Sequence, residues 1–386
     1  MQSTRTMDVF SLRDTVIEEY EKFATSFTTI HAQDIRDQVR AIYAKRTYWP
    51  EPLIQVNPNY LRSKSVATLI DEGTLDPGCG PLFPIDLYEH QCRAAATAKD
   101  RESYVVTTGT GSGKSLCFFV PIVSAILEAK RADPTPRTRA IVIYPMNALA
   151  NSQEEELKKY VTEQHGVRPV TFARYTGQES HDERLRVRDN PPDILLTNFM
   201  MLELLMTRQD PIDRAVIGHC DGLRFLVLDE LHTYRGRQGA DVAMLVRRVR
   251  ERLAPDLLCI GTSATMKSDG SVDERRRVVA DVASRLFACV VPPANVIGET
   301  LVRVTTGGHR DTVRHLLGPA IDAGIPETIT DAALREHPLA VWVETVLGMH
   351  STPEMPAWHR APPLRLSHAE RLLAEDASRP VDVAGA

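Results

Sequence analysis

Short runs of consecutive apolar residues recur through the middle of this chain and predict its regular structure. The runs are apolar throughout rather than alternating, which is typical of strands covered on both faces. Segments with helical periodicity, such as 115–130 and 151–164, separate them. Repeated strand–helix units predict an α/β fold built on a doubly wound parallel sheet. The candidate strands are 103–108, 139–145, 170–175, 193–198, 223–229 and 257–263.

The segments on either side of this alternation have different patterns. Residues 1–48 predict two helices whose apolar stripes are packing faces, and residues 48–60 contain three prolines and predict an ordered connector. We expect a closing helix and strand over 266–300, an irregular C-terminal extension, and a disordered tail over 377–386. The apolar stripes are Leu12, Val16, Tyr20, Phe23 and Phe27, then Ile35, Val39 and Ile42; in the connector Trp49, Leu53, Ile54 and Val56 are expected to be buried. The predicted domains are an N-terminal helical region with its connector (1–80), a ligand-binding domain (81–300) and the C-terminal extension (301–386).

Composition narrows the class of protein. The 386 residues carry a net charge of −5, so nucleic-acid binding would need a local surface rather than bulk charge. No run of 18 apolar residues and no signal-peptide pattern is present, which favours a cytoplasmic protein without a membrane span. No two of the six cysteines lie within four residues of each other, which excludes zinc-ribbon and iron–sulfur spacing and favours reduced thiols.

The segment TGTGSGKS (108–115) is a candidate phosphate-binding loop between a strand and an apolar helix. Its glycines allow backbone N–H groups to point at a phosphate, and the helix dipole favours an anion there. Lys114 is expected to bridge the β- and γ-phosphates of a nucleotide, and the Ser115 hydroxyl to bind Mg²⁺. The usual first glycine is Thr108 here, so the loop is a variant. The candidate ATP-binding residues of the loop are Thr108, Gly109, Thr110, Gly111, Ser112, Gly113, Lys114 and Ser115.

Two acids follow the apolar strand at 223–229. Asp229 would come next to Ser115 and hold Mg²⁺ through water, and Glu230 would orient or deprotonate the attacking water. A pair of acids at a strand end can also be a solvated turn, but the phosphate loop favours the catalytic interpretation. Gln91 has an amide that can pair with adenine, which favours ATP; it can equally be a helix-surface residue. Ser263 and Thr265, after the next strand, are candidates for coupling the acids to a neighbouring domain.

These motifs resemble a known family by their order. LYEHQ (87–91), TGTGSGKS, YPMNALANSQ (144–153), TGQ (176–178), LLTN (195–198), DELH (229–232) and SAT (263–265) follow the order of the first RecA-like lobe of superfamily 2 DEAD/DEAH-box helicases. The resemblance covers about residues 85–300 and is strongest to large bacterial helicases of DNA repair and phage defence. It implies a RecA-like P-loop NTPase fold, ATP and Mg²⁺ as cofactors, and nucleic acid as partner.

The family also implies contacts to one nucleic-acid strand. Small polar groups and backbone N–H groups after three of the strands would bind phosphate without reading bases. Each could also be an ordinary loop residue. The positions implied are Pro145, Asn147, Asn151, Gly177, Thr197 and Asn198. A basic stretch after DELH is either a nucleic-acid face or a solvated helix face, and it comprises Arg235, Arg237, Arg247, Arg248 and Arg250.

A second lobe with its arginine fingers has no counterpart in the sequence. Nothing after residue 300 matches the Q-x-x-G-R-x-G-R segment of the family, and YRGRQGAD (234–241) follows DELH directly. An absent arginine finger costs phosphoryl-transfer enzymes roughly 10³–10⁵ in rate, so slow hydrolysis is expected unless a partner protein supplies the second lobe. We therefore expect the ATP-binding lobe of a helicase or translocase, acting on single-stranded DNA or a junction, less so RNA. The alternative is an ATP-dependent binding switch without motor activity, and a small-molecule kinase is disfavoured by Gln91 and the SAT triplet.

Overall fold

The computed structural model describes residues 9–26, 30–44, 50–109, 111–161, 169–264, 271–326, 328–352 and 355–380. Of the residues singled out above, Phe27, Trp49, Thr110, Thr265 and the end of the tail (381–386) lie outside this described part. The chain divides into two units. One comprises Asn59–Val302, and the other combines Met1–Pro58 with Arg303–Ala386.

The apolar runs of the first unit form a seven-stranded sheet in which every neighbouring pair is parallel. The prediction of a parallel α/β sheet is confirmed, and all six predicted strands are present within a residue or two of each end. The closing helix and strand predicted over 266–300 are also present, as α12 (Val272–Phe287) and the edge strand β11. In spatial order the strands are β11 (Val296–Gly298), β5 (Tyr104–Thr107), β10 (Leu258–Ser263), β9 (Phe225–Leu228), β6 (Ala140–Tyr144), β8 (Ile194–Asn198) and β7 (Phe172–Arg174).

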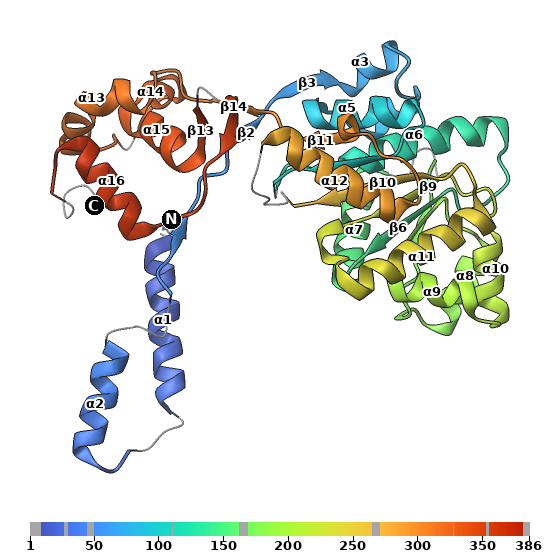
Figure 1. Cartoon of the computed structure of the whole chain (residues 1–386), viewed down its shortest axis with the longest axis horizontal. Coiled ribbons are helices and arrows are strands. Elements are labelled where there is room, and N and C mark those ends of the chain that lie inside the picture. The colour runs from blue at the N-terminus through green and yellow to red at the C-terminus, as the bar shows by residue number, and fades with distance from the viewer. Residues whose placement is uncertain are drawn as a thin grey trace, which may run out of the picture. The chain divides into compact units, whose positions relative to one another are not determined.

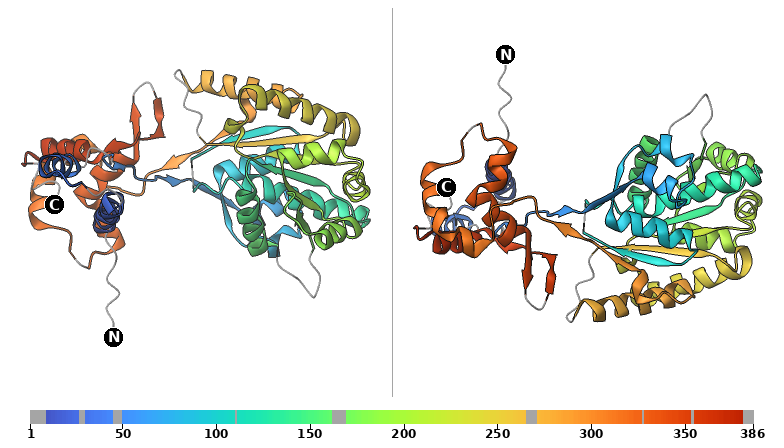
Figure 2. Two further views of the ribbon diagram at one scale, coloured as in Figure 1. Left: turned by 90° about the horizontal axis from the view of Figure 1, so that it is seen from below. Right: turned by 90° about the horizontal axis from the view of Figure 1, so that it is seen from above.

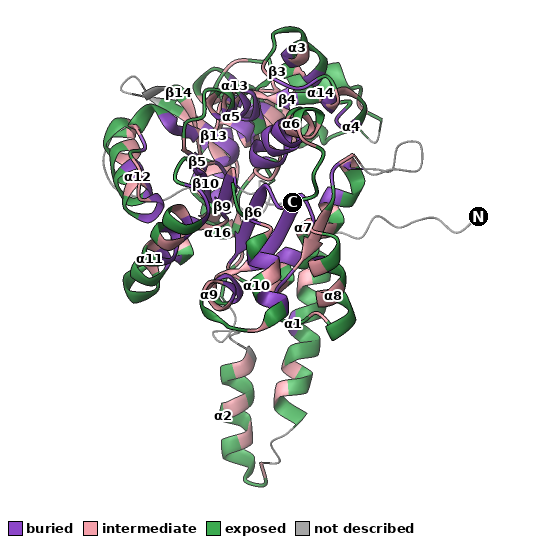
Figure 3. Cartoon of the chain, turned by 90° about the vertical axis from the view of Figure 1, so that its right-hand side faces the viewer, coloured by how far each residue is buried: buried purple, intermediate pink, exposed green. Residues whose placement is uncertain are grey.

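Helices cover both faces of this sheet, which explains why its strands are apolar throughout (Figures 1 and 2). Successive side chains of a strand point to opposite faces, so Tyr104 and Val106 join one core and Val105 joins the other. The strands are therefore buried on both sides, whereas the outer helices keep exposed surfaces (Figure 3). One core is completed by α5 (Glu89–Lys99), α6 (Leu116–Ala132) and α7 (Asn147–Tyr160), and the other by α9 (Phe199–Thr207), α10 (Pro211–Gly218), α11 (Gly236–Leu253) and α12.

The second unit is more regular than its sequence indicates. The described residues of the segment expected to be an irregular C-terminal extension form four α-helices and one turn of π-helix (Glu344–Gly348), and they pack with the connector from the N-terminal part of the chain. Strand β1 (Leu53–Ile54) pairs antiparallel with β15 (Leu364–Arg365). Leu317 and Trp342 form the centre of its core, joined by the half-buried Ile54 and Val56. The helices are α13 (Arg310–Ala323), α14 (Asp331–Glu336), α15 (Pro338–Val343) and α16 (Leu366–Ala377).

The two N-terminal helices are present, but their predicted packing faces are mostly exposed. They are α1 (Val9–Ser26) and α2 (Gln33–Ala44). Leu12, Val16, Tyr20, Phe23, Ile35 and Ile42 all have more than a third of their surface exposed, and of the connector residues Leu53 is 65% exposed. The prediction that these side chains are buried is wrong for this structure, because the helical period indicates which residues share a face but not whether anything covers it.

No helix among the described residues is both long and apolar enough to cross a membrane.

The remaining described elements are short. The remaining elements include β2 (Asn59–Tyr60), β3 (Arg62–Ser65), α3 (Val66–Asp71), α4 (Cys79–Leu82), β4 (Asp86–Tyr88), α8 (His181–Asp189), β12 (Leu301–Val302), β13 (Met349–Thr352) and β14 (Met355–Arg360).

Candidate nucleotide site and nucleic-acid edge

The parallel order of the strands brings the predicted site residues to one edge of the sheet. The loops after β5, β6, β8, β9 and β10 all leave from the carboxyl ends of their strands, where α/β sheets bind their ligands. The loop that contains Lys114 follows β5, and Asp229 follows β9. Strand β10 lies between these two strands and ends at Ser263.

The phosphate loop has the backbone shape that an anion cradle requires. Gly111 and Gly113 adopt φ angles of +77° and +69°, which side-chain-bearing residues rarely adopt. The buried Nζ of Lys114 has no hydrogen-bond partner among the described residues. Its closest acid is Glu230, whose Oε1 lies 3.6 Å away. A buried ammonium group without a hydrogen bond is costly, so this atom is suited to a phosphate oxygen.

Three side chains that contact the loop from behind hold its conformation. The Gln91 amide accepts a hydrogen bond from the Tyr88 N–H at 2.9 Å and donates to the Gly113 carbonyl at 3.0 Å. His90 Nε2 lies 2.9 Å from the Ser112 carbonyl. The Gly109 N–H donates to the carboxylate of Glu299, the residue directly after β11, at 2.8 Å. Gln91 therefore contacts the loop itself in this structure, and its predicted role in binding adenine stays a prediction.

The two acids are held by the neighbouring strand. The Thr262 hydroxyl donates to Asp229 and accepts from the Glu230 N–H at 3.1 Å. Glu230 sits in the left-handed region with a φ of +53°, a conformation that is strained for a side-chain-bearing residue and typical of functional sites. Burial raises the pKa of Asp229, and the charge of Glu230 adds to the effect. A cation next to the Asp229 carboxylate would offset the cost of its burial.

The predicted magnesium ligands have suitable chemistry. Mg²⁺ takes oxygen ligands, usually one or two carboxylates with waters and substrate phosphates. The Ser115 hydroxyl and the Asp229 carboxylate supply such oxygens, and the described residues contain no cluster of three or more His, Cys, Asp or Glu that would hold a metal alone. The Ser115 hydroxyl donates to Gln153 Oε1 at 2.7 Å, which orients it from α7.

Glu230 is also tied to the segment after β10. Its Oε2 lies 3.1 Å from His232 Nδ1 and accepts from the Ala264 N–H at 3.3 Å. Ser263 is fully buried, and its hydroxyl donates to the Ala264 carbonyl at 2.9 Å. The predicted coupling residue Ser263 therefore adjoins the segment that contacts Glu230, the predicted catalytic acid. Thr265 cannot be placed because it lies outside the described residues.

The residues implied in nucleic-acid binding lie in the last two positions of β8 and in the segments that follow β6 and β7. Asn198 donates to Asn147 Oδ1 at 2.7 Å and to the Thr176 carbonyl at 2.9 Å. Asn151 accepts from Arg174, and the exposed Gly177 has a φ of +88°. Pro145, half-buried, directly follows β6.

Thr197 differs from the other predicted nucleic-acid residues. Its side chain is fully buried, and its hydroxyl donates to the Tyr175 carbonyl at 2.6 Å. Its hydroxyl therefore bonds within the fold, and a contact between Thr197 and nucleic acid stays a prediction.

The basic stretch after DELH does not form one surface. Arg248 pairs with Glu203 on α9, and Arg250 donates to the Phe287 carbonyl at 2.7 Å. Arg247 donates to the carbonyl of Ala243 one turn earlier. Arg235 and Arg237 are exposed at the beginning of α11. Two of the five arginines thus join other elements of the fold.

Comparison with known proteins identifies relatives of this lobe. Residues 88–272 match the sequence model of the DEAD/DEAH box helicase family. The Bacillus subtilis protein described as uncharacterized ATP-dependent helicase YprA is 34% identical over 224 residues, which are 57% of this chain and 28% of that protein. The ATP-dependent helicase HRQ1 of Saccharomyces cerevisiae is 29% identical over 189 residues, 47% of this chain and 16% of that protein. The chain thus spans less than a third of the length of these relatives.

A solved structure supports the fold assignment. The crystal structure of DUF1998 helicase MrfA bound to DNA aligns with a TM-score of 0.50 and 24% identity, over 66% of this chain and 31% of that chain. At this identity the likeness concerns the fold alone.

Proposed function

We propose that this chain, whose residues 88–272 match the DEAD/DEAH box helicase family, is the ATP-binding lobe of a superfamily 2 helicase or translocase that hydrolyses ATP when it binds DNA. The observation that carries the proposal is the position of Lys114. Its buried Nζ has no hydrogen-bond partner within the described part of the chain and faces Glu230 at the carboxyl edge of the sheet. A nucleotide phosphate would supply the missing partner.

Each residue of the site has a definite task in this proposal. Backbone N–H groups of the phosphate loop and Lys114 bind the phosphates, which aligns the bond to be broken. Ser115 and Asp229 would hold Mg²⁺, which supplies positive charge that neutralises the phosphate oxygens. Glu230, fixed by His232 and the Ala264 N–H, orients the attacking water and accepts its proton.

The proposed nucleic-acid partner is single-stranded DNA or a junction with duplex. Within the polar edge formed by Asn147, Asn151, Gly177 and Asn198, the side-chain N–H groups of Asn147 and Asn151 are donors that suit a phosphate backbone. The Asn198 amide and the Gly177 N–H donate to neighbouring residues and shape the edge instead. The MrfA structure contains DNA. We also propose that the protein acts in DNA repair or phage defence. A protein that supplies a second RecA-like lobe would add the arginine that such sites use.

ATP turnover by the purified chain, with and without single-stranded DNA, tests the proposal. We expect turnover that DNA stimulates and that Glu230→Gln reduces by at least a hundredfold while ATP stays bound. Lys114→Ala should abolish ATP binding itself. Glu251→Gln, an exposed acid on α11, is the matched control and should leave both quantities unchanged.

The same experiment distinguishes the alternative, an ATP-dependent binding switch without motor activity. In a switch, DNA affinity would depend on ATP but turnover would be negligible, and Glu230→Gln would change little. Tight ATP binding without stimulated turnover in the wild type would exclude the enzymatic proposal for the isolated chain. If the Lys114→Ala variant kept both ATP turnover and ATP binding, this result would contradict the enzymatic proposal and the binding-switch alternative.

A further inference from the structure

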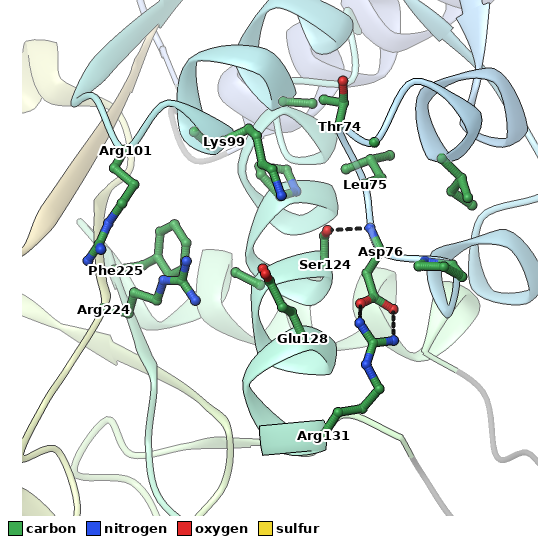
Figure 4. A pocket seen from close by; sticks show the side chains of 17 residues that line it. Thr74, Leu75, Asp76, Lys99, Arg101, Ser124, Glu128, Arg131, Arg224 and Phe225 are labelled. Atoms are coloured by element: carbon green, nitrogen blue, oxygen red, sulfur yellow. Dashed lines mark hydrogen bonds and ion pairs between the residues drawn. The ribbon is translucent and has the colours of Figure 1, made fainter. Parts of the chain in front are cut away.

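A cavity of about 490 Å³ lies in the first unit, and Figure 4 shows the side chains that line it. No residue of the phosphate loop is among the described residues of its lining. Its walls come from the connection between α3 and α4, from α5 and α6, and from the first residues of β9. Arg224 and Phe225 mark the amino end of β9, whereas Asp229 follows its carboxyl end. The cavity therefore opens at the edge of the sheet opposite to the proposed ATP site.

Three cationic side chains line this cavity without a partner. Lys99, Arg101 and Arg224 make no ion pair or side-chain hydrogen bond with any described residue. Arg131, also in the lining, differs because it is engaged by both carboxylate oxygens of Asp76. Glu128 contributes one opposing carboxylate, so the unpaired groups carry three positive charges against one negative charge.

The partly buried position of Arg224 makes the excess positive charge in the cavity energetically unfavourable. Its guanidinium lies over the Phe225 ring, 5.8 Å from the centroid. Burial lowers the pKa of Arg224, and the positive charge of Arg101 lowers it further, while Glu128 acts in the opposite direction. An anion placed between Arg101 and Arg224 would remove this repulsion.

The backbone at Arg101 is a second, independent observation. Arg101 follows the end of α5 with a φ of +62°, in the position where helices commonly end with glycine. The Arg101 N–H donates to Ala98 and the Glu102 N–H to Thr97, both at 3.1 Å. Glycine would satisfy this turn with less strain, so the arginine at this position points to a use for its side chain.

We propose that this cavity binds a small phosphorylated molecule, whose phosphate is held by Lys99, Arg101 and Arg224. Guanidinium groups bind phosphate oxygens with paired, charge-assisted hydrogen bonds. Phe225, Pro121 and Ala125 provide an apolar wall for the rest of the molecule. The volume lies within the range of roughly 300–1,000 Å³ that is common for ligand pockets. The inference is independent of the ATP site and of its proposed activity.

The test is a melting-temperature titration of the full chain with inorganic phosphate and, separately, with adenosine monophosphate. Lys114→Ala serves as the background because it removes phosphate binding at the loop. Sodium chloride at equal ionic strength corrects for screening. We expect phosphate to raise the melting temperature in this background. Adding Arg224→Gln should weaken the apparent affinity by roughly 10–100-fold, the effect of losing one charged hydrogen bond.

Two further variants test whether the loss of phosphate binding is specific to the arginines that line the cavity. Arg101→Gly relieves the backbone strain, so it should fold at least as well and yet bind phosphate more weakly. Arg214→Gln removes an exposed arginine on α10, outside the cavity, and should leave phosphate binding unchanged.

Three results would overturn the proposal. They are the absence of stabilisation beyond that by chloride in the Lys114→Ala background, an affinity that Arg224→Gln leaves intact, and stabilisation by a single-stranded oligonucleotide but by neither small phosphate. The last result would assign these basic groups to nucleic acid.

Discussion

At the scale of single residues, the phosphate loop is shaped as much by the residues behind it as by its own sequence. Gln91, His90 and Glu299 each contact a backbone group of the loop. They fix the loop before any ligand arrives, and preorganisation of this kind lowers the cost of binding. Two predictions follow from these contacts.

Gly113 is the point at which the loop lies closest to α5. A Cβ atom at this position would lie 2.6 Å from Gln91 Nε2, and the φ of +69° is unfavourable for alanine. Gly113→Ala is therefore expected to displace Gln91 and weaken ATP binding at least tenfold, measured by calorimetric titration. Gly218→Ala is the control because no atom lies within 4 Å of its Cβ position. Equal ATP affinity of both variants would contradict the prediction.

His90 makes the stability of this unit depend on pH. Burial lowers the pKa of His90, although its hydrogen bond to Ser112 acts in the opposite direction. The folded state thus disfavours the protonated ring, so the unfolded state binds more protons, and stability is lost as the pH falls below about 6.5. We expect His90→Gln, which keeps a donor for Ser112, to unfold with a shallower pH dependence by calorimetry between pH 7.5 and 5.5.

The control for this prediction is His181→Gln. His181 is exposed at the beginning of α8, and its replacement should leave the pH dependence of the wild type unchanged. A wild-type slope equal to that of His90→Gln would show that His90 is not the responsible group.

The sequence predicted some site residues but not others, for a physical reason. Lys114 and Glu230 lie in local motifs whose spacing alone reports their chemistry. Thr262, Gln153 and Glu299 contact the site through the fold. Gln153 ends the segment YPMNALANSQ and Thr262 directly precedes SAT, but neither motif indicates by its spacing that these side chains reach Ser115 and Asp229. Glu299 lies in a stretch without a distinctive pattern. Only the pairing of β5 with β11 brings Glu299 to Gly109, and strand order cannot be read from apolar runs.

At the scale of elements, burial on both faces made the strands predictable. Ile141 and Val142 are both fully buried, on opposite faces, so the run is continuously apolar. The helices of the second unit were harder to predict, because α13 contains Pro319 and α14 and α15 have only six residues each. Short helices give too few turns for a clear period.

A buried aspartate connects three of these helices. Asp376 on α16 accepts hydrogen bonds from Arg310 on α13 at 2.6 Å and from the Trp342 Nε1–H on α15 at 2.8 Å; Arg314 donates to it as well. Burial by itself would raise the pKa of Asp376, but these hydrogen bonds outweigh it and hold the pKa below its usual value. Its stabilising contribution is therefore complete above the ordinary aspartate pKa and is lost as the pH falls.

Asp376→Asn is expected to lower the unfolding free energy of this unit by about 2–3 kcal/mol at pH 7, since hydrogen bonds to charged groups contribute about 1.5–3 kcal/mol. The difference from the wild type should shrink below about pH 4. All three tryptophans of the sequence, Trp49, Trp342 and Trp358, lie outside the range Asn59–Val302 that forms the first unit. Tryptophan fluorescence during denaturant unfolding therefore excludes the first unit and follows Trp342 and Trp358 of the second.

Asp322→Asn is the matched control for Asp376. It removes an exposed pair with Arg379, and surface pairs contribute about 0–1 kcal/mol. A loss as large as that in Asp376→Asn would show that burial is not what makes the central aspartate important.

At the scale of the whole molecule, the second unit is assembled from both ends of the sequence. Val56 donates through its backbone to Leu347 at 3.1 Å, and the Gln55 amide donates to the Ala361 carbonyl at 2.8 Å. The first unit occupies the sequence between these partners. The stability of residues 53–56 therefore depends on residues far along the chain.

Truncation after Val302 tests this dependence. The amides of Ile54 and Val56 should exchange with deuterium much faster in the truncated chain than in the full chain, because their partners are removed. The amides of β6 and β9, whose partners lie within the first unit, should stay protected. Unchanged protection of residues 53–56 would show that this segment has other partners.

The strand order also has a consequence for synthesis on the ribosome. Strand β5, which leads into the phosphate loop, pairs only with β10 and β11 within the described sheet, and these strands are made roughly 150–190 residues later. At translation rates of about 5–20 residues per second, β5 waits on the order of 10–40 s for its neighbours. During this time its apolar residues lack both partners, as in other folds with distant pairings. Strand β5, which precedes the proposed phosphate loop, thus waits longest for a first partner among the strands of the described sheet and most needs protection from aggregation.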